Sequence, residues 1–85
     1  MSKRNPHDDA RRELKILLRN IRKSKKITQT ELANLINEPQ PFISKYETGD
    51  RILDCIEVYQ ILKAMNVPMI GFIKEFERLL KIDRF

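Results

Sequence analysis

The sequence predicts an all-α protein, a single domain of five short helices. Only two glycines occur among the 85 residues, and apolar residues recur every three or four positions along almost the whole chain. No run alternates apolar and polar residues in the way that a half-buried strand would. A chain of this length has room for one modest core and not for two, so one small helical domain is expected.

The first helix is expected to begin at Asn5 and Pro6. Asparagine is a favoured capping residue, and a proline in the first turn loses no backbone hydrogen bond because that turn has none to lose. Asp8 and Asp9 follow in the first turn, where the positive end of the helix dipole favours acidic side chains. The basic run RKSKK at 22–26 closes the helix. Its expected core face consists of Leu14, Leu17, Leu18 and Ile21.

The stretch ITQTEL predicts the start of the second helix. Thr28 can cap the helix, and Glu31, three residues on, can reach back to the backbone of Thr28. Asn37 tolerates the left-handed conformation that ends a helix, so the second helix is expected to be short. Its expected buried side consists of Leu32, Ala33 and Ile36.

Residues 37–49, NEPQPFISKYETG, carry a proline on each side of Gln40. Proline disrupts a helix interior but is tolerated in the first turn. We therefore expect the third helix to begin at Pro39 or Gln40 and to end at Gly49, whose missing Cβ suits a helix C-terminus. The expected core side carries Ile43 and Tyr46, with Phe42 at its edge, and the expected outward side carries Gln40, Pro41, Ser44 and Lys45.

Two more helices are predicted by the remaining sequence. Asp54 and Glu57 repeat the capping pattern, Asn66 ends the fourth helix, and Pro68 starts the fifth. The fifth helix carries an apolar stripe wider than one small core needs, and an exposed part of such a stripe commonly marks a partner surface. This stripe consists of Met69, Phe72, Ile73, Phe76, Leu79 and Leu80, followed by Ile82 and Phe85.

The chain is basic, and its charge is unevenly spread. Residues 1–26 hold ten lysines and arginines against three acids, whereas the rest of the chain holds seven against nine. Such an asymmetry is typical of a protein that binds phosphates, although a solvated basic face would look the same. We assign residues 1–9 to a basic arm and the start of the first helix, 10–80 to the domain, and 81–85 to a tail. Lys3 and Arg4 either stay disordered or order against DNA.

Several classes of protein are not supported by the sequence. One cysteine, Cys55, permits no disulfide framework and is expected to be a small buried residue, and His7 has no second ligand nearby. No acid–base pair, activated nucleophile, glycine-rich phosphate loop or metal-ligand spacing is visible, so neither an enzyme nor a cofactor is expected. Charged residues at the N-terminus and short apolar runs predict a cytoplasmic protein without a membrane segment.

The stretch ITQTELANLINEPQPFISKYETGDR, followed by LDCIEVYQILKAMNVP, resembles the lambda-repressor-like helix-turn-helix family, also called the XRE family, over about residues 10–80. In a helix-turn-helix, the second helix of the pair enters the major groove with its N-terminal residues at base edges. The points of resemblance are specific in combination. They are Thr28-Gln29, Glu31-Leu32-Ala33, Gln40, Ile43 to Glu47, Gly49 and Asn66-Val67.

The resemblance implies a role for each matching position. Gln29 would bind a phosphate and brace Gln40 through a hydrogen bond, and Arg22 with Glu47 would tie the first helix to the third. Base reading is implied for Gln40, Pro41, Ser44 and Lys45, with adenine for Gln40 and guanine for Lys45. Phosphate contacts are implied for Thr28, Gln29, the backbone at Thr48, and Arg51. A homodimer interface is expected at Met69, Phe72, Ile73, Phe76 and Leu80.

The sequence departs from the family pattern at three positions. Asn37 stands where glycine is usual, Glu38 stands where an apolar residue is usual and is expected to point outward, and Pro41 replaces a polar reader, which leaves an apolar contact to a thymine methyl group. Without the resemblance, Gln29, Gln40 and Lys45 would be ordinary surface side chains. Phe42 and Tyr46 could also stack on the bases of a single strand, but core packing is expected for Tyr46.

The resemblance implies sequence-specific binding to double-stranded DNA by a homodimeric transcriptional regulator. We expect a repressor that acts by occupying an inverted-repeat operator with half-sites about 34 Å apart or a multiple of that. Two alternatives stay open. One is the antitoxin of a toxin–antitoxin pair, which also binds a toxin protein. The other is a helical protein-interaction adaptor that keeps the fold but has lost operator binding.

Overall fold

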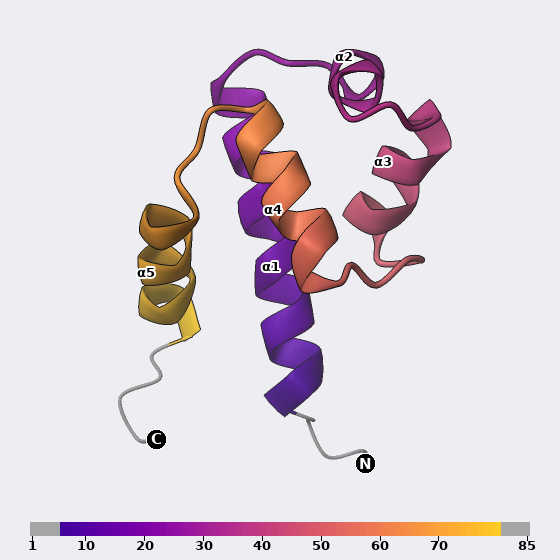
Figure 1. Cartoon of the computed structure of the whole chain (residues 1–85). Helices are drawn as coiled ribbons and strands as arrows, with labels where there is room; N and C mark the ends of the chain where they lie inside the picture. Colours follow the sequence, from indigo (N-terminus) through magenta and orange to yellow (C-terminus); the bar gives the residue numbers. More distant parts are fainter. Residues whose placement is uncertain (1–5, 81–85) are drawn as a thin grey trace.

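The computed structural model describes residues 6–80, with side chains from residue 9 onward. Five α-helices and no strand occur in this part of the chain, which confirms the predicted fold class. The expectations for Lys3, Arg4, the His7 side chain, Ile82 and Phe85 lie outside the described residues. The helices are α1 (Pro6–Ser24), α2 (Gln29–Leu35), α3 (Gln40–Thr48), α4 (Cys55–Ala64) and α5 (Met69–Leu80) (Figure 1).

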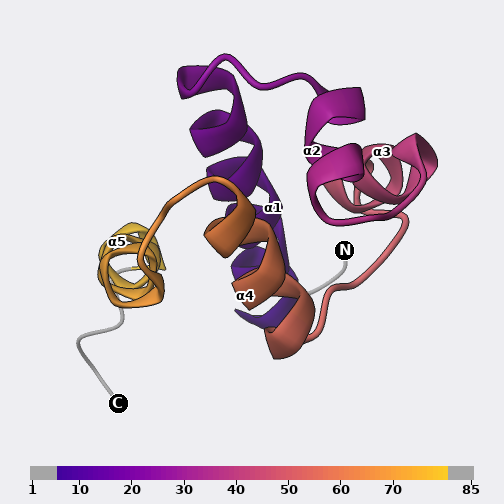
Figure 2. The same ribbon diagram turned by 45° about the horizontal axis from the view of Figure 1, so that its top comes forward.

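The helices are arranged around α1 and α4. Figures 1 and 2 show α2 and α3 on one side of these two helices and α5 on the opposite side. The helices α2 and α3 pack against each other, α3 also packs on α1, and α5 packs on both α1 and α4. The pair of helices α2 and α3 therefore lies on one side of the molecule, and α5 lies on the other.

One hydrophobic core joins all five helices. Each helix contributes at least one buried side chain, and burying a side chain of this size contributes roughly 1.5–3 kcal/mol of stability. Between the α2–α3 side and the α5 side, this single core consists of the buried residues of α1 and α4, which are Leu17, Leu18, Val58, Ile61 and Leu62. Its fully buried large members are Leu18, Leu32, Ile43, Tyr46, Ile61, Leu62 and Met65.

Reciprocal capping starts α2 and α4, as the sequence predicts. The backbone N–H of Glu31 donates to the Thr28 hydroxyl at 3.0 Å, and the backbone N–H of Thr28 donates to the Glu31 carboxylate at 2.8 Å. Asp54 and Glu57 exchange the same two bonds at 2.7 and 2.9 Å. Each box satisfies two backbone donors that have no partner within the helix.

Left-handed residues end the short helices. Asn37 and Asn66 both have φ near 61°, as expected for residues that tolerate this conformation, and Gly49 has φ 92°. Lys26 also has a positive φ, 59°, which its residue type did not predict. A Cβ at Gly49 would lie 2.9 Å from the Nζ atom at the flexible end of Lys15, which can move aside, so this position favours glycine for its backbone conformation.

The two prolines sit where a helix tolerates them. Pro39 is the N-cap of α3 and Gln40 its first residue, which places Pro41 at the second helical position. The backbone N–H of Phe42 donates to the Pro39 carbonyl oxygen at 2.9 Å and closes the first turn. No backbone hydrogen bond is lost at Pro41, because the first turn supplies no acceptor for that position.

Two expectations about burial are wrong. Cys55 is exposed although its spacing places it on the same helix face as the buried Val58 and Leu62, because the core does not cover the first turn of α4. Phe72, expected in a dimer interface, is only 3% exposed and belongs to the core, where its ring stacks on Phe76 with 6.2 Å between the centroids. The wide apolar stripe of α5 is thus partly explained by packing within one chain.

Candidate nucleic-acid interface

The outer side of α3 presents the residues expected to read bases. Gln40, Pro41 and Lys45 are exposed and Ser44 is half-buried, whereas the opposite side of the helix is buried in the core. The packing of α2 against α3 brings the N-terminal ends of both helices to this surface. Glu38, in the turn between them, is exposed as expected.

The side chains of Gln29 and Gln40 are joined by a hydrogen bond. Gln40 donates from Nε2 to Oε1 of Gln29 at 2.7 Å, and Gln29 donates from its own Nε2 to Oε1 of Glu47 at 2.9 Å. An ionised carboxylate only accepts, so Glu47 fixes which end of the Gln29 amide faces Gln40. The Gln40 amide is held in turn, because one of its two N–H groups is used by Gln29.

A buried ion pair anchors this chain of hydrogen bonds. Arg22 of α1 donates from Nε and Nη2 to the two carboxylate oxygens of Glu47 at 2.7 and 3.0 Å, and from Nη1 to the Ile27 carbonyl at 2.8 Å. Both side chains are buried. The hydrogen bond that Arg22 donates to Glu47 raises the pKa of Arg22, so the guanidinium stays charged. Because Arg22 belongs to α1, the position of Gln40 depends on three helices.

The residues expected at phosphates lie around the two helix ends. Thr28 is exposed and Gln29 half-buried at the start of α2. At the end of α3, the Thr48 hydroxyl donates to the Lys45 carbonyl at 3.1 Å, and the Nζ atom of Lys15 donates to the Thr48 carbonyl at 3.3 Å. The sequence did not predict this contact from Lys15, because it depends on how α1 packs against α3.

Arg51 already has partners within the chain. Its guanidinium pairs with Glu57 and lies over the ring of Phe42, 4.6 Å from the centroid. A cation over an exposed aromatic ring contributes about 0.5–1 kcal/mol. A phosphate contact by Arg51 would therefore compete with Glu57. Neither partner was predicted, since both lie in other segments of the chain and no local spacing links them to Arg51.

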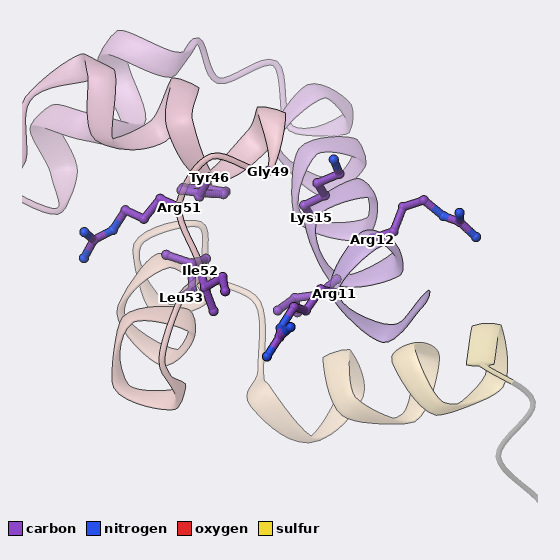
Figure 3. Close-up of a pocket in the computed structure, with 9 residues that line it drawn as sticks. Arg11, Arg12, Lys15, Tyr46, Gly49, Arg51, Ile52 and Leu53 are labelled. Carbon is purple, nitrogen blue, oxygen red and sulfur yellow. The ribbon is translucent and has the colours of Figure 1, made fainter. Parts of the chain in front are cut away.

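A cavity lined by cations opens between α1 and the segment that follows α3 (Figure 3). Its volume is about 660 Å³. Figure 3 shows the guanidinium groups of Arg12 and Arg51 pointing away from each other, so they do not converge on one point. The lining residues are Arg11, Arg12, Leu14, Lys15, Tyr46, Gly49, Arg51, Ile52 and Leu53.

Tyr46 forms part of this lining with its hydroxyl fully covered. No hydrogen-bond partner for that hydroxyl occurs among the described residues. Burial is the main cause that raises the pKa of Tyr46, so the phenol stays neutral. Its ring meets Phe42 edge-on, with 5.9 Å between the centroids. Tyr46 thus packs in the core, and Phe42 is half-buried at the edge.

The residues of α5 expected at a dimer interface have mixed environments. Ile73 is exposed, while Met69, Phe76 and Leu80 are half-buried and Phe72 is buried. For the four residues other than Phe72, the dimer interface stays a prediction. Within residues 9–80 no three histidine, cysteine or acidic side chains gather as metal ligands would, and none of the helices has the length and apolar content to cross a membrane.

This fold and this surface define a helix-turn-helix protein, with α2 and α3 as the motif. A family model described as Helix-turn-helix matches residues 18–72. The chain therefore belongs to the lambda-repressor-like, or XRE, helix-turn-helix family, as the sequence resemblance predicted. That family consists of DNA-binding regulators, so the chain is a DNA-binding regulatory domain.

The chain is also similar to a longer eukaryotic protein. It is 46% identical over 65 residues to Multiprotein-bridging factor 1b of Arabidopsis thaliana. The matched stretch is 76% of this chain and 46% of the relative. The chain thus spans less than half the length of the relative it matches, and the likeness concerns only that part of the relative.

Proposed function

We propose that the chain binds a specific double-stranded DNA sequence as a homodimer and represses transcription by occupying an operator. The observation that carries the proposal is the hydrogen bond from Gln40 to Gln29, whose amide is oriented by Glu47. A side chain held in one orientation before DNA arrives loses less conformational freedom on binding, which favours a specific contact.

The orientation of Gln40 suits adenine. One N–H of its amide is used by Gln29, which leaves the carbonyl oxygen to accept from adenine N6 and the second N–H to donate to N7. A bidentate pair of this kind discriminates against a wrong base by about 1–3 kcal/mol. Lys45, one turn further along the exposed side of α3, would reach guanine, and Pro41 would contact a thymine methyl group.

Phosphate contacts would set the position of α3 in the groove. Four groups around the ends of α3 can each bind a phosphate without reading the base sequence. They are Thr28, Gln29, the backbone at Thr48, and Arg51. The basic residues of α1 strengthen the attraction, since Lys15 already approaches the C-terminal end of α3. This sequence-independent part of the binding makes the affinity sensitive to salt.

A homodimer would bind an inverted repeat. Two copies related by a two-fold axis present their α3 helices to successive major grooves, about 34 Å or one helical turn apart. Repression then needs no chemistry, because a bound dimer excludes other proteins from the same stretch of DNA.

A second candidate is a protein-bridging adaptor that uses the same fold. The observation that favours it is the 46% identity to a protein named as a multiprotein-bridging factor. An antitoxin that also binds a toxin protein is a related alternative. Both predict a stable complex with another protein, and the adaptor predicts no sequence preference on duplex DNA.

Selection of bound duplexes from a randomised DNA pool at about 150 mM salt tests the proposal, because nonspecific phosphate binding is weakened there. We expect enrichment of an inverted repeat that contains adenine at a fixed position in each half-site. The matched control is Gln40→Ala, for which that adenine should lose its enrichment. Binding without enrichment, or no binding, would favour the adaptor.

A further inference from the structure

The cavity between α1 and the segment after α3 has the size of a site for a small molecule. We refer to it as the cationic cavity, and its volume of about 660 Å³ lies within the roughly 300–1,000 Å³ typical of such sites. Figure 3 shows that α1 forms one wall, while the end of α3 and the residues after it form the other. The α1 wall consists of Arg11, Arg12, Leu14 and Lys15, and the opposite wall consists of Tyr46, Gly49, Arg51, Ile52 and Leu53.

The lining of the cationic cavity combines positive charge with apolar surface. Four of its nine residues are lysine or arginine, none of the nine is acidic, and the others apart from Gly49 are apolar or aromatic. A second cavity, of about 430 Å³ beside Leu35, differs because its lining holds Lys26 and Glu31, whose charges cancel. An anion with an apolar body is therefore attracted to the cationic cavity more strongly than to the second one.

Lys15 is the cation best placed to hold an acidic group in this cavity. Its side chain is half-buried, and its Nζ atom donates to the Thr48 carbonyl oxygen at 3.3 Å. That acceptor is neutral, and an ammonium group has three donors, so a charged acceptor would be a stronger partner. By contrast, Arg12 and Arg51 already pair with carboxylates of the chain.

Tyr46 gives a second, independent indication of a ligand. This residue lines the cavity and is only 1% exposed, and its hydroxyl has no hydrogen-bond partner among the described residues. Burial raises the pKa of Tyr46, so the hydroxyl keeps its proton and can both donate and accept. Buried polar groups rarely lack a partner. A polar atom of a ligand seated beside Tyr46 would supply one.

We propose that the cationic cavity binds a small organic anion with an apolar or aromatic body. The acidic group, a carboxylate, sulfonate or phosphate, pairs with Lys15, and the body packs against Ile52 and Leu53. An inorganic anion would use the charges alone and leave the apolar part of the lining in water, so an organic ligand fits this lining better. This inference goes beyond operator binding and does not depend on it, because the ligand is bound without DNA.

Two matched fluorescent probes test the inference on the whole chain without DNA. Anilinonaphthalene sulfonate carries a negative charge, and phenylnaphthylamine has the same rings without it. We expect Lys15→Gln to weaken binding of the sulfonate at least about fivefold, and to change binding of the neutral probe less than about twofold. The matched control is Lys63→Gln, which removes an exposed lysine near the end of α4 and should change neither affinity.

A second pair of variants tests where the probe binds. Ile52 is 65% exposed, so Ile52→Asp should keep the fold while it places a negative charge on the apolar wall. Binding of the sulfonate should fall at least about fivefold, because like charges repel. The matched control is Ile70→Asp on α5, where the replaced side chain is 72% exposed and binding should stay within about twofold. In NMR spectra of the labelled chain, the sulfonate should shift the amide signal of Gly49 and leave that of Leu35 in place.

Three results would each overturn the inference. The first is no binding of the sulfonate to the unaltered chain, and the second is binding that Ile52→Asp leaves unchanged or that shifts Leu35 rather than Gly49. The third is an equal effect of Lys15→Gln on both probes, which would mean that charge plays no part. Circular dichroism of each variant shows that the fold is kept. Since no DNA is present, each result is separate from success or failure of the operator experiment.

Discussion

At the scale of single residues, Gln29 links the candidate base reader to the interior. It accepts from Gln40 and donates to Glu47, so its amide transmits the orientation of a buried carboxylate to an exposed side chain. We expect Gln29→Ala to lower half-site affinity by about 5–20-fold, which corresponds to roughly 1–2 kcal/mol for one braced contact and one phosphate contact. Binding titrations at fixed salt measure this change.

Stability separates this effect from a loss of fold. Glu47 keeps both bonds from Arg22 when Gln29 is shortened, so the free energy of unfolding in urea should fall by no more than about 1 kcal/mol. Gln60→Ala, an exposed glutamine of α4, is the matched control and should change neither quantity. Unaltered affinity and base preference in Gln29→Ala would show that bracing plays no part in recognition.

At the scale of helices, the pair of Arg22 and Glu47 fixes α1 against α3. Removing one partner of a buried ion pair leaves the other charge uncompensated, so we expect Glu47→Ala to destabilise the fold by about 3–5 kcal/mol. The control is Glu75→Ala, which removes an exposed pair with Arg78 within α5 and should change stability far less, because solvent screens that pair. Urea unfolding of both variants measures the difference, and equal losses would contradict a structural role for the buried pair.

The helices themselves were largely predictable, because their ends are marked by local chemistry. Each of these signals involves residues within four positions of each other. They are the capping boxes at Thr28 and Asp54, the left-handed residues Asn37 and Asn66, and the position of Pro41 in a first turn. Such interactions leave a pattern in the sequence itself.

Packing between helices was predicted less well. Spacing along one helix does not determine which helix faces pack against each other. That packing decides the exposure of Cys55, the burial of Phe72 and the position of Arg51 over Phe42. The sequence therefore predicted a partner surface from the wide apolar stripe of α5. In the structure, α5 packs against α1, which covers part of this stripe. The contact between Gln29 and Gln40 was expected from the family resemblance rather than from spacing.

At the scale of the whole molecule, charge is separated from the residues that would read bases. Residues 1–26 carry most of the positive charge, while the exposed face of α3 adds a single cation, Lys45. Affinity and specificity would then come from different parts of the chain: the basic first third attracts DNA of any sequence, and the helix-turn-helix selects among sequences.

This separation predicts how affinity depends on salt. If six to ten phosphates are contacted per dimer, the affinity for the selected repeat should fall about 10³–10⁵-fold between 50 and 200 mM salt. Arg51→Gln should reduce the slope of log affinity against log salt by about 1 per half-site, provided that Arg51 exchanges Glu57 for a phosphate on binding. The base preference should stay the same, because a phosphate contact carries no sequence information.

Arg78→Gln is the matched control for the salt experiment. Arg78 is an arginine paired with a glutamate, as Arg51 is, but it lies on α5, across the molecule from α3, so the slope should not change. Binding titrations over a salt series give both slopes. A slope equal to that of the unaltered chain in Arg51→Gln would mean that Arg51 stays with Glu57 and supports the fold rather than the DNA. A changed base preference would instead place Arg51 at a base edge, since only contacts in the groove distinguish one sequence from another.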